Sequence, residues 1–263
     1  MKNLEIYCVT DKPLKYLNKT GYILGAVGKN KFPKNYIKCN FKKNIFFKEK
    51  YYSELTFHYW FWKNELKNKK KNHWIGFCQK RRFWLQEKKN KNRILKKTPK
   101  IWKNYEAIIC SKINLGKPKL SKLIKRGWKN VISSPNILSS KRKYSIELHF
   151  DLFHGYGNLI KAIELMHKKD REEFKKYVKN KNYFNPHIMF IAKPRIVNLW
   201  FKDLFSWLLK CEKVFGFKKL KGYDTTRLYA YLAERYLSFW FKKYTRYKEM
   251  PIFFKDLSDF SEL

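Results

Sequence analysis

The sequence has few cysteines and no motif that would pair them. Cys8, Cys39, Cys78, Cys110 and Cys211 are odd in number and widely spaced, and no two of them form a C-x-x-C pair. This pattern excludes a disulfide framework and a cysteine zinc site. We expect the thiols to be free and buried, in a reducing compartment.

Long apolar runs, leader segments and linkers are also missing. No stretch approaches the roughly 18 to 20 apolar residues that a membrane-spanning helix needs. Residues 1–9 enter a strand-like run without a charged and apolar leader. No internal repeat and no Gly/Ser-rich or Pro-rich linker divides the chain. We therefore expect one domain over residues 1–263, cytoplasmic or peripheral at the inner face of the membrane.

Acidic residues and arginines are scarce beside lysine. The 61 basic and 21 acidic residues give a net charge of +40, and only 10 of the basic residues are arginines, which leaves 51 lysines. Arginine is the residue preferred for reading bases and gripping phosphate, so this balance argues against a sequence-specific nucleic-acid binder. A general lysine and asparagine bias explains most of the charge. The rest suits anionic partners, including an acidic membrane leaflet at about 1 kcal/mol per basic residue.

Apolar residues make up 44% of the chain and aromatic residues 19%, so the chain is expected to fold around a core. Strand patterns alternate with helical ones in the first half, and helical patterns dominate the second. The expected strands are 4–10, 21–28, 73–78 and 105–110, the expected helices are 51–66, 158–168, 170–179, 194–215 and 224–243, and residues 185–192 form a loop and short strand. This order predicts an α/β domain with a mixed, mainly parallel sheet over residues 1–155 and a mainly helical portion over 156–263. Its ligand is expected at the carboxyl ends of the strands.

The segments 51–64 and 74–84 carry more specific chemistry than a core element requires. Apolar residues at spacings of three and four form one helical stripe, at Tyr52, Leu55, Tyr59, Trp62 and Leu66. Burial does not explain the polar residues beside that stripe, which are Ser53, Glu54, Asn64, Arg81 and Arg82. We interpret them as a polar site carried by a helix and the end of the next strand.

These segments resemble a known family. The residues Tyr-Ser-Glu-Leu-Thr (52–56), Tyr-Trp-x-Trp-Lys-Asn (59–64) and Ile-Gly-Phe-Cys-Gln-x-Arg-Arg-Phe (75–83) are similar to the bacterial capsular and exopolysaccharide glycosyltransferases known as domain of unknown function 4422. Later blocks follow in the same order, at 151–155, 185–190 and 231–235. The resemblance thus covers nearly the whole chain, with Lys80 standing where an aromatic residue is usual.

The resemblance implies a GT-A-like glycosyltransferase. Its donor would be a nucleotide sugar and its acceptor a lipid-linked intermediate of a surface polysaccharide. It implies donor-binding roles for Thr10, Ser53, Glu54, Asn64, Gln79, Arg81 and Arg82, catalytic roles for Asp151 as base and His154, and an acceptor or loop role for Asn185, His187 and Met189. Most GT-A enzymes hold Mg²⁺ or Mn²⁺ through Asp-x-Asp, a motif that this sequence lacks. We therefore assign no metal ligand and expect basic residues to neutralise the departing diphosphate, while a divalent cation, Mg²⁺ or Mn²⁺, stays an open alternative.

Three alternative interpretations remain open. Glu147, His149 and Asp151 alternate, so on a strand they would share one face and could form a metal cluster. The charge and the aromatic residues also suit a nucleic-acid-binding protein without catalysis, although no binding motif is present. Finally, the lysine-rich and aromatic stretch from Trp200 to Phe217 would suit a scaffold at a membrane surface.

Overall fold

The computed structural model describes residues 3–87, 93–116, 132 and 144–256 of the chain. It divides into two compact units: residues 1–111, 187–202 and 241–263 form the first, and residues 112–186 and 203–240 form the second. Helices α9 (Pro194–Phe215) and α11 (Leu228–Tyr244) each begin in one unit and end in the other. The expectation of a single domain, with parts 1–155 and 156–263, stays a prediction. Residues 112–144 are basic and without clear periodicity, which predicts loops or short helices, and most of them lie outside the described residues.

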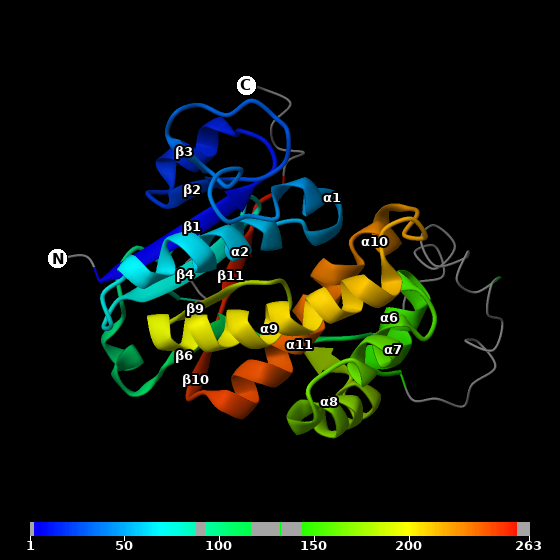
Figure 1. Ribbon diagram of the computed structural model, residues 1–263. Coiled ribbons are helices and arrows are strands. Elements are labelled where there is room, and N and C mark those ends of the chain that lie inside the picture. Colours follow the sequence, from blue (N-terminus) through cyan, green and yellow to red (C-terminus); the bar gives the residue numbers. More distant parts are fainter. Residues whose placement is uncertain (1–2, 88–92, 117–131, 133–143, 257–263) are drawn as a thin grey trace. The chain divides into compact units, whose positions relative to one another are not determined.

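The first unit is built on a mixed sheet. Within the described residues the sheet has nine strands, in the order β10-β6-β9-β4-β1-β2-β3, with β5 paired to β4 and β11 to β5 (Figure 1). The strands are β1 (Leu4–Thr10), β2 (Ile23–Ala26), β3 (Tyr36–Lys38), β4 (Trp74–Gln79), β5 (Arg82–Trp84), β6 (Ala107–Cys110), β9 (Phe190–Ala192), β10 (Tyr247–Met250) and β11 (Ile252–Phe254). Strands β3, β2, β1 and β4 run parallel, whereas β9 is antiparallel to both β4 and β6. The predicted α/β class is confirmed.

One face of this sheet is covered by helix α2 (Leu55–Asn64), which follows the short helix α1 (Glu49–Tyr52). The Phe61 ring of α2 lies 4.8 Å from the Tyr7 ring of β1 and 5.3 Å from the Phe77 ring of β4, measured between centroids. Gly25 of β2 makes room for this packing, because a Cβ there would lie 2.6 Å from the Phe57 ring. The glycine therefore serves helix packing.

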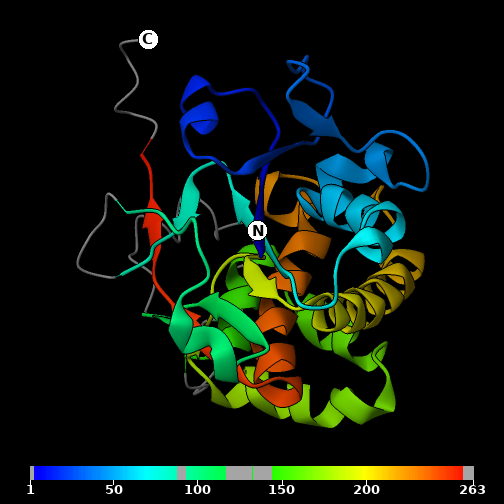
Figure 2. The ribbon, with the colours of Figure 1, turned by 90° about the vertical axis from the view of Figure 1, so that its left-hand side faces the viewer.

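The opposite face holds a second aromatic and aliphatic layer. Trp74 and Trp102 meet edge to face at 4.9 Å, and the Trp102 indole N–H donates to Met250 Sδ at 3.2 Å. Cys8 and Cys78 are register partners on β1 and β4 and point into this layer. All five cysteines are free and buried, as the sequence predicted. Strand β11 lies beside β5 at the margin of the sheet, red next to teal in Figure 2.

The second unit is mainly helical. Its helices are α6 (Ile146–His154), α7 (Asn158–Glu164), α8 (Lys168–Asn180), α10 (Tyr223–Thr226) and the relevant parts of α9 and α11, with a two-stranded sheet of β7 (Ile113–Asn114) and β8 (Tyr183–Phe184). The 3₁₀ helices of the described residues belong to the first unit. They are η1 (Lys15–Lys19), η2 (Phe46–Lys48), η3 (Leu66–Asn68) and η4 (Lys100–Asn104). The helices predicted from residue 158 onward are confirmed within a few residues at each end. In the described part of the chain, no helix is long and apolar enough to cross a bilayer.

Two expected elements differ from those observed. Residues 146–154 form a helix instead of a polar strand, with the Ser145 hydroxyl accepting from the Leu148 N–H at 3.3 Å as its N-cap. The helix expected over 51–66 is interrupted at Ser53, whose φ is 50°, so α1 and α2 are separate helices. For residues 146–154, burial of every side chain except that of His149 overrides the alternating pattern.

Candidate functional site

The candidate site lies in the first unit, where β1 and β4 end side by side. The two strands are parallel and in register as far as the pair Val9 and Gln79, so the residues that follow emerge at the same edge of the sheet. Thr10 closes the first turn: its hydroxyl donates to the Lys12 carbonyl at 2.6 Å and accepts from the Lys12 N–H at 3.2 Å. Ligands of open α/β sheets bind at such an edge.

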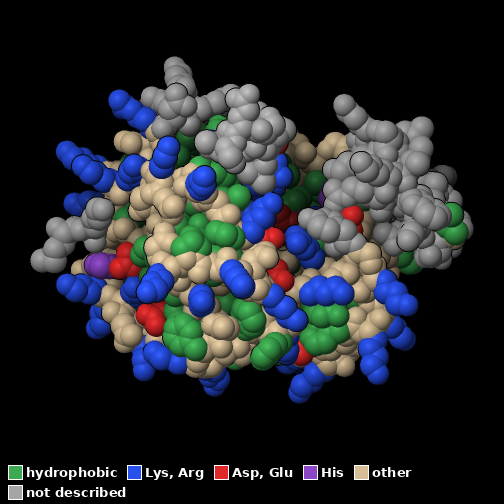
Figure 3. Space-filling view, turned by 90° about the horizontal axis from the view of Figure 1, so that it is seen from above, with side chains coloured by type: hydrophobic (Ala, Val, Ile, Leu, Met, Phe, Trp, Pro, Cys, Tyr) green, Lys and Arg blue, Asp and Glu red, His purple; other side chains and the backbone are tan. Residues whose placement is uncertain are grey.

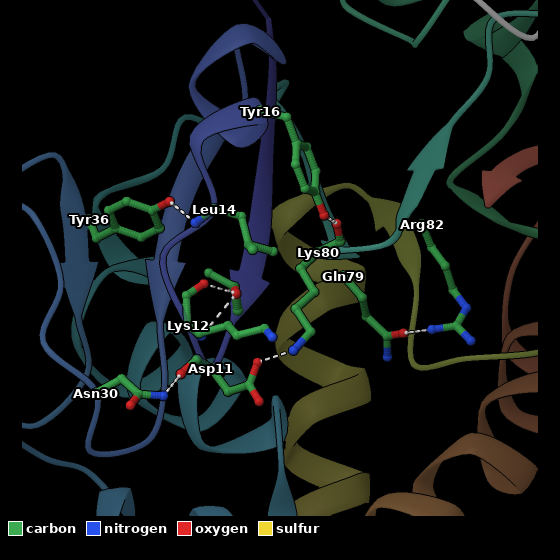
Figure 4. Close-up of polar contacts among 10 residues, drawn as sticks. Asp11, Lys12, Leu14, Tyr16, Asn30, Tyr36, Gln79, Lys80 and Arg82 are labelled. Atoms are coloured by element: carbon green, nitrogen blue, oxygen red, sulfur yellow. Dashed lines mark hydrogen bonds and ion pairs between the residues drawn. The ribbon is translucent and has the colours of Figure 1, made fainter. Parts of the chain in front are cut away.

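A chain of three side chains crosses this edge. The Gln79 amide donates to the Glu54 carboxylate and accepts from Arg82 Nη1 at 2.9 Å. Glu54 stands at the start of α2, Gln79 ends β4 and Arg82 begins β5, so three elements contribute. Because Gln79 takes a hydrogen bond from it, the Arg82 guanidinium is held in a defined orientation at the edge (Figure 4).

An ion pair joins the two loops that follow β1 and β4. Lys80 Nζ contacts the Asp11 carboxylate, and the two side chains point toward each other in Figure 4. The Tyr16 hydroxyl donates to the Lys80 carbonyl, and burial raises the pKa of Tyr16 to about 12, so the hydroxyl stays a proton donor at neutral pH. The Asp11 carbonyl accepts from the Asn30 amide at 2.7 Å. These contacts hold the Lys80 side chain between the loops that follow β1 and β4.

Ser53 directly precedes Glu54 and has two unusual properties. Its backbone angles, φ 50° and ψ −131°, lie in a region that residues other than glycine rarely adopt. Its hydroxyl is buried and finds no hydrogen-bond partner among the described residues. A strained backbone and an unsatisfied hydroxyl beside Glu54 are typical of a residue kept for ligand contact.

The paired arginines, predicted as one unit, have different surroundings. Arg81 Nη2 contacts the Asp256 carboxylate at 3.3 Å, and Arg81 Nε donates to the Lys255 carbonyl at 3.3 Å. Arg82 instead contacts Gln79. Both guanidinium groups rest on the Phe254 ring of β11, at 4.6 Å and 5.3 Å from its centroid. Arg82 therefore belongs to the candidate site more directly than Arg81.

Two other predicted residues of the first unit have side chains away from this cluster. Asn64 ends α2, so about 15 Å of helix separates it from Glu54, and its amide donates to the Lys43 carbonyl at 2.8 Å. Met189 is fully buried in the hydrophobic core of the sheet. His187 is half-buried and has a positive φ of 66° in the turn before β9, the strand that pairs antiparallel with β4.

The predicted catalytic residues lie in the second unit, on α6. Asp151 is 1% exposed, and its Oδ1 accepts from the Gly157 N–H at 3.0 Å. The His154 ring stacks on Tyr231 at 3.7 Å, and its Nδ1 lies 3.2 Å from the Asp224 carbonyl. Asn185, also buried in this unit, exchanges backbone hydrogen bonds with the Ser238 hydroxyl. Each of these polar residues thus has a structural contact of its own.

The alternation of Glu147, His149 and Asp151 does not create a metal face. On a helix, positions two apart point about 200° away from each other, so His149 diverges from the other two. Among the described residues, no three His, Cys, Asp or Glu side chains converge as metal ligands. The Asp11 and Glu54 carboxylates of the site are engaged by Lys80 and Gln79.

Sequence reasoning missed Asp11, Tyr16 and Lys80. The segment after β1 reads Asp-Lys-Pro, which by itself predicts a turn that ends the strand. Its position after a predicted strand of an α/β sheet was the available signal, since that is where ligand-binding loops begin. No local pattern could have paired Asp11 with Lys80, because 69 positions separate them.

The first unit is thus an α/β sheet with polar side chains gathered where the parallel strands β1 and β4 end. The chain belongs to the family described as domain of unknown function (DUF4422), which matches residues 5–246. No curated protein matches it. Among solved structures it is similar to the apo structure of WbbM, a bifunctional glycosyltransferase, with a TM-score of 0.69 and 19% identity over 96% of this chain and 45% of that one. The chain spans less than half the length of WbbM, and at this identity the likeness shows the fold.

Proposed function

We propose that this protein is a glycosyltransferase. It takes a sugar, a hexose by our expectation, from a nucleotide-sugar donor held at the edge formed by β1 and β4. It passes the sugar to a lipid-linked intermediate of capsule, exopolysaccharide or O-antigen at the inner face of the membrane. The observation that carries the proposal is the Glu54, Gln79 and Arg82 chain at that edge, joined there by Lys80. The family resemblance and the fold shared with WbbM support it.

The chemistry of transfer explains why two cations are needed there. When the bond between sugar and diphosphate breaks, negative charge develops on the departing phosphate oxygens. Arg82, oriented by Gln79, would donate two parallel hydrogen bonds to those oxygens, and Lys80 would add a point charge. Contacts of this kind contribute roughly 1.5 to 3 kcal/mol each. The proposal needs no step through a metal ion.

The nucleic-acid alternative is not proposed, because no described observation favours it over glycosyl transfer. On the face shown in Figure 3, Lys and Arg side chains are spread among neutral and apolar groups.

The experiment is a thermal-shift screen of the purified protein against a panel of nucleotide sugars, followed by affinity measurements on two variants. Arg82→Ala should weaken binding of the selected donor by roughly tenfold or more, since one charge-assisted contact is lost. Arg81→Ala is the matched control and should change the affinity by less than about threefold, because its guanidinium pairs with the exposed Asp256.

Binding alone would leave transfer untested, so the selected donor is then supplied to membranes that contain lipid-linked saccharide. Appearance of labelled sugar in the lipid fraction supports the proposal. Failure of every nucleotide sugar to bind, or equal binding by wild type and Arg82→Ala, would contradict it.

A further inference from the structure

The segment of residues 40–50, which runs from the end of β3 into the first turn of α1 in Figure 1, exposes aromatic side chains to solvent. Phe47 is 89% exposed and Phe41 is 44% exposed. Isolated apolar residues on a surface are normal, but a phenylalanine with most of its ring in water is not. We call residues 40–50 the aromatic loop.

The exposed rings are surrounded by positive charge. Lys42, Lys43 and Lys50 are exposed, and Lys48 is half-buried between them. The acidic residue of the loop, Glu49, is also half-buried and turns toward Gly28, where a Cβ would lie 3.5 Å from its Oε2. The loop therefore presents lysine ammonium groups and phenylalanine rings on the same projection.

Hydrogen bonds fix the loop in this form. The Asn64 side chain donates to the Lys43 carbonyl at 2.8 Å and accepts from the Lys43 N–H at 3.3 Å. Asn44 donates to the Lys42 carbonyl at 2.8 Å and accepts from the Phe46 N–H at 3.0 Å. The Phe41 ring also rests edge-on against Trp60 at 5.2 Å. Because the backbone is held in place, Phe47 stays exposed without an ordering cost on binding.

We propose that the aromatic loop docks the protein on an anionic lipid bilayer. Phe47 enters the boundary between headgroups and acyl chains, and the surrounding lysines contact anionic headgroups. Aromatic rings with flanking lysines are the composition that partitions to this boundary. The net charge of +40 favours the encounter with an anionic surface. This inference deepens the proposed function by naming the segment that meets the membrane, but it is tested without donor or transfer.

The test is cosedimentation of the full chain with vesicles of phosphatidylcholine alone or mixed with phosphatidylglycerol. The wild-type protein should pellet with the mixed vesicles and remain in the supernatant with the neutral ones. Phe47→Ser should lower the partition coefficient roughly tenfold, because the ring supplies the apolar contact. Replacing Lys42 and Lys43 by Gln should lower it by a similar factor at low salt and by less at about 0.15 M salt.

The chain offers matched controls in the same unit. Ile101 is 59% exposed and is flanked by the exposed Lys100 and Lys103. Two control variants remove the same kinds of group outside the aromatic loop: Ile101→Ser, and the double change of Lys100 and Lys103 to Gln. Both should leave vesicle binding within about twofold of wild type. Melting temperatures of all variants report whether each one folds.

Several outcomes would overturn the proposal. These are absence of wild-type binding to the anionic vesicles, equal loss in the Ile101 and Phe47 variants, or binding of RNA in place of vesicles through the same loop residues. Failure here would not touch the proposed activity, because nucleotide-sugar binding by thermal shift needs no membrane. Phe47→Ser should bind the donor like wild type.

Discussion

At the scale of single residues, polar side chains in this protein have two different uses. Gln79 and Arg82 are oriented by each other and contribute to an edge where a ligand can reach them. Asp151 is buried, and its carboxylate accepts a hydrogen bond from the Gly157 N–H. The family resemblance assigns Asp151 a catalytic role, and the structure gives it a capping role. One substitution can separate the two.

Asp151→Asn keeps an oxygen that accepts from Gly157 but removes the negative charge. If Asp151 is the general base, turnover should fall by roughly 10² to 10⁴ while donor affinity and melting temperature stay close to wild type. The measurements are sugar transfer, donor affinity and thermal unfolding on the same preparation. A variant with near-wild-type turnover would show that the carboxylate serves only the fold.

At the scale of elements, helix α2 is notable because it is buried on nearly every side. Residues 55–61 are all buried, including His58. Glu54 and His58 stand one turn apart, but their side chains have different surroundings. The His58 ring lies 4.3 Å from Phe77 and 5.7 Å from Phe201, and its Nδ1 has no partner among the described residues. Glu54 contacts Gln79 instead.

This burial predicts acid sensitivity. Burial lowers the pKa of His58 to about 3, whereas an unfolded chain has a histidine pKa of about 6.5. The stability contributed by neutral His58 is fully present above pH ~6.5 and is lost as the pH falls toward 3, because only the unfolded chain takes up the proton. The loss is at most roughly 1.4 kcal/mol per pH unit.

Thermal unfolding between about pH 7 and pH 5 checks this prediction. The melting temperature of wild type should fall more steeply than that of His58→Leu, which lacks the titrating group. His167→Asn is the control, since His167 is exposed and asparagine retains an acceptor for the Lys169 N–H at the start of α8. It should follow the wild-type curve, and parallel curves for all three proteins would refute the argument.

At the scale of the whole molecule, charge is the dominant property. The sequence carries 61 basic and 21 acidic residues. Several of the carboxylates are committed to ion pairs, among them Asp11 with Lys80 and Glu106 with Arg195. Most lysines therefore repel one another across the surface, which opposes the compact state.

Salt should relieve this repulsion. Raising the ionic strength from about 0.01 to 0.15 M shortens the screening length from about 30 to 8 Å. We expect the melting temperature to rise by a few degrees, equivalent to roughly 1 to 2 kcal/mol. Sodium chloride and sodium fluoride at equal ionic strength separate screening from specific anion binding, and an unchanged or lower melting temperature in both would contradict the prediction.

The sequence by itself determined the class of the fold, the family resemblance and most of the regular elements. Strand β1 was predicted with its observed limits, and β4, β6, α9 and α11 nearly so, because each has a clear apolar period and clear ends. It also located the segment that contributes Glu54, Gln79 and Arg82 to the site.

Only the tertiary structure decided the remaining features. Residues 146–154 have apolar groups on all sides, so their period could not distinguish a buried strand from a buried helix. The insertion of β9 between β4 and β6, the break at Ser53 and the separate directions of Arg81 and Arg82 depend on contacts between distant segments. The pairing of Asp11 with Lys80 has the same origin. Long-range burial and hydrogen bonding set these features, and they leave no local pattern in the sequence.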